Sequence, residues 1–254
     1  MDIIRHRFPF NFVDPHTVLE RIKLDQHNYI KYEIPLYELK RIAKISRYLV
    51  IESIMQKAAY LTSHHTFNED KDDFVGTFLL TMKVTFLDDF LNQPCEPNAT
   101  LTCYVTFNNY SIYGRYSLTA RVKQKDVITI ENTCKNSSSV RETTRGGFDT
   151  QLLEDDMKKI NAVATLGALK KEFSIPPGLA LFDGHFENEP IFPAVMQMQL
   201  LDDLGKIPKL CKISCKLSLP ILPGEAFRIE ETSKGIIFSN HQGRLAKYTI
   251  DNLS

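Results

Sequence analysis

The sequence predicts an α+β protein built from two similar halves. A strand, one helix and several further strand-like runs follow one another twice along the 254 residues. A stretch rich in Ser, Thr and Gly at residues 135–150 separates the two halves and is typical of an exposed connection. We therefore expect a duplicated chain with a first domain at residues 1–134, a linker at 135–150 and a second domain at 151–254.

The first half begins with a strand at residues 29–35, where apolar and polar side chains alternate. Apolar residues then recur at helical spacing over residues 37–62, and a polar insertion at 63–73 is expected to be a loop. Runs rich in Thr, Val, Tyr and Phe, which favour strands, lie at residues 78–86, 100–107, 116–122 and 127–134.

The second half repeats this order. Residues 162–168 and 171–175 resemble strands, and a short helix is expected from about Pro193. Further strands are expected at residues 212–219, 227–231, 236–240 and 244–250.

Composition excludes several classes of protein. Basic and acidic residues balance at 31 each, which argues against nucleic-acid binding driven by bulk charge. No uncharged apolar run is long enough to span a membrane, and residues 1–15 lack the apolar core of a signal peptide. The five cysteines are odd in number and form no CxxC pair. We therefore expect a cytoplasmic protein with free thiols, no metal site and no cofactor.

Residues 184–199 read GHFENEPIFPAVMQMQ, in which Gly-His-Phe is followed by two prolines and a helix. This segment resembles the signature of the hotdog-fold 3-hydroxyacyl-[acyl-carrier-protein] dehydratases. Residues 220–225, residues 6–14 and the Glu-x-x-x-Gln of residues 52–56 resemble other segments of that family. The resemblance implies two tandem hotdog domains, each an antiparallel sheet wrapped around a central helix, paired as a pseudo-dimer.

The resemblance also implies one composite catalytic site. The family builds each site from the His of one subunit and the acid of the other. Where the family would place an acid to accompany His185, this chain has Gln199, and where it would place a His to accompany Glu52, the chain has Glu38. We therefore predict that His185 and Glu52 meet in one site, and that the site containing Glu38 and Gln199 is inactive.

The residue types suit this chemistry. Tyr48, Glu52 and Gln56 form a narrow polar stripe on an otherwise apolar helix, where desolvation is expected to raise the pKa of Glu52 and make it a general acid. A neutral His185 imidazole, held by stiff backbone, would be the base. By resemblance, the substrate-binding residues are Gly184, Phe186, Pro193, Ala194, Val195 and Gln56, with the amides of Ala194 and Val195 facing the thioester oxygen.

The chain departs from the family at Glu187 and Asn188, which replace Pro-Gly, and at Ala194, which replaces Gly. These changes touch the rim of the acyl tunnel or the oxyanion donors. The leading hypothesis is dehydration of a 3-hydroxyacyl thioester, carried by acyl carrier protein or coenzyme A, in fatty acid, polyketide or pigment biosynthesis. The alternatives are a hotdog acyl thioesterase and a non-catalytic acyl-binding or partner subunit of another dehydratase. A further homodimer or a complex with another hotdog protein is also consistent with the sequence.

Overall fold

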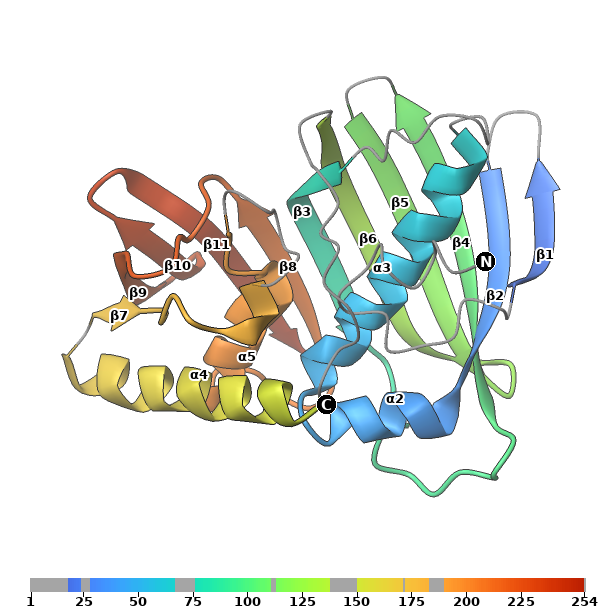
Figure 1. The fold of residues 1–254 in the computed structure, drawn as a ribbon, viewed down its shortest axis with the longest axis horizontal. Helices are drawn as coiled ribbons and strands as arrows, with labels where there is room; N and C mark the ends of the chain where they lie inside the picture. The colour runs from blue at the N-terminus through green and yellow to red at the C-terminus, as the bar shows by residue number, and fades with distance from the viewer. Residues whose placement is uncertain are drawn as a thin grey trace.

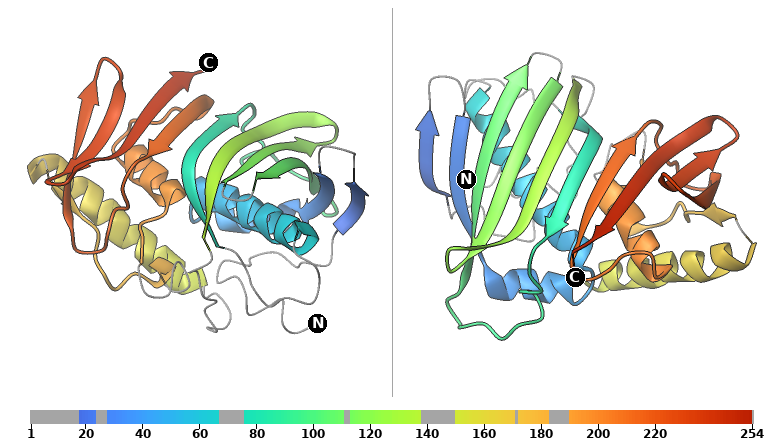
Figure 2. Two further views of the ribbon diagram at one scale, coloured as in Figure 1. Left: turned by 90° about the horizontal axis from the view of Figure 1, so that it is seen from above. Right: turned by 180° about the vertical axis from the view of Figure 1, so that it is seen from behind.

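The structure is a computed structural model. It describes residues 18–23, 28–66, 76–110, 113–137, 150–170, 172–182 and 190–253. These residues form one large antiparallel sheet with the helices on its concave face (Figures 1 and 2).

In the first half the sheet curves around one long central helix, α3, which is preceded by a shorter helix. The buried tyrosine Tyr32 ties the sheet to α3, because its hydroxyl donates a hydrogen bond of 2.8 Å to the carbonyl of Ile54. The elements are β1 (Val18–Lys23), β2 (Asn28–Pro35), α2 (Leu36–Ala43), α3 (Arg47–Thr66), β3 (Gly76–Phe86), β4 (Thr100–Tyr110), β5 (Tyr113–Val122) and β6 (Lys125–Ser137). All five strands predicted for this half are confirmed, with longer ends.

The predicted helix at residues 37–62 is two helices. The chain turns between Ala43 and Arg47, and Ser46 begins α3 as its N-cap: its Oγ accepts the Tyr48 amide at 3.1 Å. Helix α3 continues to Thr66, so the prediction of a loop from residue 63 was wrong for residues 63–66. The rest of that insertion, residues 67–73, lies outside the described residues.

The second half has a shorter sheet and a different helical layer. Its central helix α5 lies against the sheet, and a longer helix, α4, covers α5 from outside (Figure 1). The elements are α4 (Thr150–Lys170), β7 (Phe173–Ser174), the 3₁₀ turn η1 (Ala180–Phe182), α5 (Ala194–Asp203), β8 (Cys211–Leu217), β9 (Ala226–Thr232), β10 (Gly235–Asn240) and β11 (Gly243–Asn252). The predicted strands after α5 are confirmed, and β7 lies inside the strand predicted at residues 171–175.

Helix α4 corrects the prediction of a strand at residues 162–168. The local alternation there belongs to a longer pattern with helical spacing, because Leu153, Asp156, Ile160 and Ala164 are all buried on one face. Gly167 continues this face, and a Cβ atom at that position would lie 2.1 Å from the ring of Phe173. The glycine therefore lets β7 pack directly against α4.

The two halves share one sheet, in the order β1-β2-β4-β5-β6-β3-β8-β11-β10-β9-β7. At their junction β3 pairs antiparallel with β8, the strand that follows the central helix in each half. Antiparallel pairing of equivalent strands is what a twofold relation between two domains requires. Met82, Val84, Ile213 and Cys215 face the helices across this junction and are buried, which makes one continuous core. No helix within the described ranges is long and apolar enough to cross a membrane.

Candidate functional site: the junction of the two central helices

The two central helices begin at equivalent positions. Glu52 is the sixth residue of α3 and Gln199 is the sixth residue of α5. The helices pack against each other across the junction of the two halves. The predicted acid and the residue predicted to have replaced it therefore occupy matching places in the two halves.

Gln199 takes part in a chain of hydrogen bonds that joins the two halves. The Ser46 hydroxyl, which caps α3, donates to Gln199 Oε1 at 2.6 Å. Gln199 Nε2 in turn donates to Asp203 Oδ1 at 2.7 Å, one turn further along α5. Gln199 therefore accepts one hydrogen bond and donates another, which a side-chain amide can do and a carboxylate cannot.

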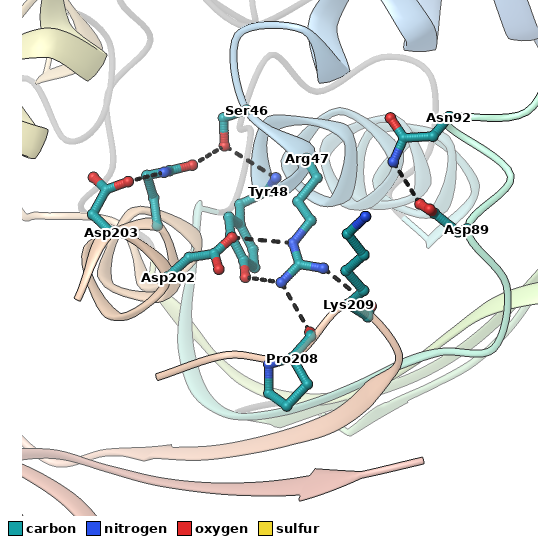
Figure 3. A network of polar contacts seen from close by, with 10 residues as sticks. Ser46, Arg47, Tyr48, Asp89, Asn92, Asp202, Asp203, Pro208 and Lys209 are labelled. Atoms are coloured by element: carbon teal, nitrogen blue, oxygen red, sulfur yellow. Dashed lines mark hydrogen bonds and ion pairs between the residues drawn. The ribbon is translucent and has the colours of Figure 1, made fainter. Parts of the chain in front are cut away.

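Arg47, the first residue of α3, makes the second link between the halves (Figure 3). Its guanidinium donates to the carbonyls of Pro208 and Lys209, both at 3.1 Å, in the segment after α5. Its Nε lies 3.3 Å from Asp202 Oδ2 on α5. It also donates to the Tyr48 hydroxyl at 2.7 Å. The same group stacks over the rings of Tyr48 and Phe86, each centroid 5.0 Å from the guanidinium carbon.

Burial shapes the electrostatics of this junction. Desolvation raises the pKa of Asp203, despite hydrogen bonds from Gln199 and Asn161. Its Oδ2 is buried and has no hydrogen-bond partner among the described residues. Burial likewise raises the pKa of Tyr48. The Tyr48 hydroxyl therefore stays neutral and bonded to Arg47, so Tyr48 belongs to the junction and not to an open polar stripe with Glu52.

Glu52 lies on an apolar part of α3. Its neighbours Leu49, Ile51 and Ile54 are buried, while Glu52 itself is partly exposed. Its predicted raised pKa stays a prediction. Gln56 lies one turn further along the same helix, and its side chain is outside the described residues.

The start of α5 offers backbone donors. Pro193 precedes the helix in an extended conformation, and its carbonyl accepts the amides of Met196 and Gln197, both at 3.0 Å. The amides of Ala194 and Val195 precede the first intrahelical bond, and no backbone carbonyl accepts them in the part of the chain that the structure describes. Both residues are buried.

The other predicted site residues, Gly184, His185 and Phe186, lie outside the described residues. The predicted meeting of His185 with Glu52 therefore stays a prediction. Glu38, the residue expected opposite Gln199, accepts a hydrogen bond from Tyr37 at 3.2 Å, and within the described residues no hydrogen bond or ion pair joins it to Gln199. No cluster of His, Cys, Asp or Glu suited to a metal ion occurs among the described residues.

Sequence reasoning missed the residues that join the halves: Ser46, Arg47, Asp202 and Asp203. One signal was available for Ser46, because a serine at a helix start is a frequent N-cap. Nothing local marks Arg47, since its partners Pro208 and Lys209 lie more than 160 residues away.

The long sheet, the central helix in each half and the pairing of β3 with β8 define a double-hotdog protein. A crystal structure of a putative oleoyl thioesterase from Lactobacillus plantarum has the same fold, with a TM-score of 0.52 and 10% identity over 90% of this chain and 97% of that one. HtdX of Mycobacterium tuberculosis is similar over 89% of this chain and 100% of its own, with 10% identity and a TM-score of 0.49.

Within this fold class, residues 163–247 match the ApeI-like family, described as ApeI dehydratase. The similarity to this dehydratase family thus lies within the second half of the chain. A search of the curated proteins finds no match.

Proposed function

We propose that this protein is a hydro-lyase that removes water from a 3-hydroxyacyl thioester on an acyl carrier protein, giving the trans-2-enoyl thioester. One composite site, with His185 as base and Glu52 as acid, would do this. The family match of residues 163–247, which include His185, supports the reaction class.

The observation that carries the assignment is that the two equivalent helix positions hold different residues. Gln199 is an amide bonded to Ser46 and Asp203, so it has no proton to transfer and no freedom to turn toward a substrate. Glu52 occupies the matching position in α3 and is a carboxyl group. This asymmetry supports the proposal of one active site and one structural site.

The contact of Gln199 also indicates where Glu52 lies. Contacts between twofold-related elements are reciprocal: if one residue touches the partner's equivalent of another, the reverse contact occurs too. Gln199 touches Ser46, the residue before α3. By the same relation, Glu52 is expected beside Pro193, the residue before α5. Glu52 would therefore lie at the helix end whose free amides belong to Ala194 and Val195.

These groups account for each step of the dehydration. The Ala194 and Val195 amides, with the positive end of the α5 dipole, would hold the thioester oxygen and stabilise negative charge on it. His185 would take the proton from C2, and the C2–H electron pair would form the new double bond to C3. The C3–O bond would break as Glu52 donates its proton to the departing hydroxyl, which leaves as water.

The test measures dehydration of 3-hydroxyacyl thioesters, on acyl carrier protein and on coenzyme A, by the wild type and three folded variants. His185→Ala and Glu52→Gln should each lower kcat by about 10²- to 10⁴-fold, the usual contribution of a positioned acid or base. Glu38→Gln is the control, because it makes the same change at the carboxyl group predicted for the inactive site, where the family has the His, and it should leave the rate unchanged.

Three results would contradict the proposal. Loss of activity in His185→Ala with full activity in Glu52→Gln would make Glu52 structural. Thioester cleavage without dehydration would favour a thioesterase, and inactivity at every chain length would favour a partner subunit.

A further inference from the structure

A cavity lies inside the first half, where α3 crosses the inner face of the sheet (Figure 1). Its volume is about 60 Å³, and it is lined by Met55 and Ala58 of α3 and by side chains of β4, β5 and β6. A group of the size of a water molecule needs roughly 10–15 Å³, so this α3 cavity has room for about four to six such groups. All of its described lining residues belong to the first half, so it is separate from the contacts that join the two halves.

One wall of the α3 cavity is the side-chain amide of Asn132, on β6. Its neighbours on the same face of β6, Ile130 and Cys134, are buried. Across the sheet Asn132 is paired with Tyr116 of β5 and with Met82 of β3. Met82 is buried, and Tyr116 packs against the core. Asn132 is therefore a polar residue at a position where the sheet otherwise presents core side chains to α3.

The amide oxygen of Asn132 has an unused capacity to accept a hydrogen bond. Its Oδ1 is buried, and no group among the described residues donates to it. A buried acceptor without a partner costs free energy that an apolar side chain of similar size would not cost, so core packing does not explain the amide. A bound water does not explain it well either, because a buried water needs about two to four polar partners and most of the lining is apolar.

The α3 cavity lies along the helix from the predicted acid. Met55 is three residues after Glu52 and Ala58 is three residues further, so the three follow one another along one side of α3. With a rise of about 1.5 Å per residue, Ala58 is about 9 Å beyond Glu52 along the helix axis. A chain that extends from a reaction at Glu52 and follows α3 would therefore enter the cavity with its far end.

We propose that the α3 cavity holds the far end of the substrate's acyl chain, and that Asn132 selects chains with a hydroxyl group near that end. The hydroxyl donates to Asn132 Oδ1, and the apolar walls contact the methylene groups before it. This hydroxyl is additional to the one at C3 that the reaction removes. The identity of the occupant as substrate rests on the proposed function, because it takes Glu52 as the acid. Binding in the cavity can be measured without any activity.

The first test measures binding of two isomeric probes to the full chain, n-pentanol and butyl methyl ether, by NMR at the methyl group of Met55. The two probes are equal in size, but only the alcohol can donate a hydrogen bond. The wild type should bind the alcohol at least about tenfold more tightly, because the ether leaves the buried oxygen unpaired. Asn132→Leu should lose this preference and bind the ether at least as tightly as the alcohol.

Two further variants are the controls for binding. Thr133→Val is the matched control, because Thr133 is the next residue of β6 and its side chain points to the opposite face of the sheet. It should keep the preference for the alcohol. Ala58→Val narrows the cavity and should weaken the binding of both probes. Asn132→Leu should be at least as stable as the wild type in urea, since it removes an unpaired buried acceptor.

The second test measures dehydration of 3-hydroxyacyl thioesters that are matched in chain length and end in a methyl or a hydroxyl group. The wild type should favour the hydroxyl-terminated substrate by at least about tenfold in kcat/KM, since discrimination between substrates appears in that ratio. Asn132→Leu should reverse the preference, whereas Thr133→Val should match the wild type.

Equal binding of the two isomers by the wild type, or binding of neither, would overturn the α3 cavity as a site for a hydroxyl-bearing chain. A loss of stability in Asn132→Leu together with no probe binding would assign the amide to the fold alone. Selective binding of the alcohol with equal kcat/KM for both thioesters, in an active enzyme, would overturn the link to the substrate. Selective binding by an inactive wild type would contradict the proposed function and leave the cavity's selectivity standing.

Discussion

The central helices of the two halves start alike and then diverge. Helix α3 has 20 residues and is largely enclosed by the curved sheet, whereas α5 has 10 residues and is covered from outside by α4 (Figure 2). At their sixth residues and one turn beyond, α3 has Glu52 and Gln56, while α5 has Gln199 and Asp203. The order of acid and amide is reversed between the halves.

This reversal shows how one position can serve two purposes after duplication. In α5 the amide comes first, accepts a bond from the opposite half and donates to the acid behind it. A carboxylate at position 199 would lack that donor and would face Asp203 with like charge. In α3 the acid comes first, at the position that the proposed reaction needs. Under the proposed function, catalysis and the joining of the halves would thereby be separated between equivalent positions.

The largest stability effect is expected at Arg47, which tests whether the junction joins the halves. Arg47→Met removes the guanidinium bonds to Pro208, Lys209 and Tyr48 and the ion pair with Asp202. The free energy of unfolding in urea should fall by about 2–4 kcal/mol, because several charge-assisted bonds in a partly buried site are lost.

Arg121→Met is the control for this experiment. Arg121 pairs with Asp126 at 2.6 Å, but both side chains are more than 40% exposed. Arg121→Met should lower the free energy of unfolding by less than about 1 kcal/mol, as for other surface ion pairs. Equal losses in the two variants would mean that the junction adds nothing beyond a surface contact.

A smaller effect is expected for Gln199→Glu, which makes the two halves alike at this position. We expect the free energy of unfolding to fall by about 1–2 kcal/mol at neutral pH, since one donor disappears and two carboxylates approach each other. Gln151→Glu is a matched control, because Gln151 donates to Asp155 at the same spacing on the exposed surface of α4. The Gln151→Glu change should lower the free energy of unfolding by no more than about 0.5 kcal/mol. If Gln199→Glu instead gained a second active site, the division of roles between the helices would be wrong.

The smallest effect concerns pH. Burial raises the pKa of Asp203, so its contribution to folding is present when it is protonated and is lost as the pH rises through the folded pKa. The wild type should therefore gain stability relative to Asp203→Asn as the pH falls from neutral toward the ordinary carboxyl value of 3.8.

Asp155 should behave in the opposite way. Its hydrogen bond with Lys158 lowers its pKa, so its contribution is present above the ordinary carboxyl pKa and is lost on acidification. At neutral pH the free energy of unfolding of Asp155→Asn should thus be lower than that of the wild type, and this difference should disappear as the pH falls. Urea unfolding of the wild type and both variants between pH 7 and the acid range checks this. If the stability differences of the two variants from the wild type changed with pH in the same direction, burial would not be the cause at Asp203.

Much of the fold could be predicted because strands and amphipathic helices leave periodic patterns. The strands of both halves other than β1 and the helix from Pro193 were predicted in this way. Helix α4 was missed because a short alternation at residues 162–168 was weighed without the longer helical repeat that contains it. The break before Arg47 was missed because the apolar spacing continues across it, and only the cap formed by Ser46 marks the new helix.

By itself, the sequence determined the duplicated α+β organisation, the two central helices and the contrast between Glu52 and Gln199, since these depend on residue types and on local spacing. Only the tertiary structure decided what Gln199, Arg47 and Asp156 contact. Their partners in other elements lie between 25 and 162 residues away along the chain. Such contacts form only when β3 and β8 join the halves and α4 packs over η1, so no local pattern encodes them.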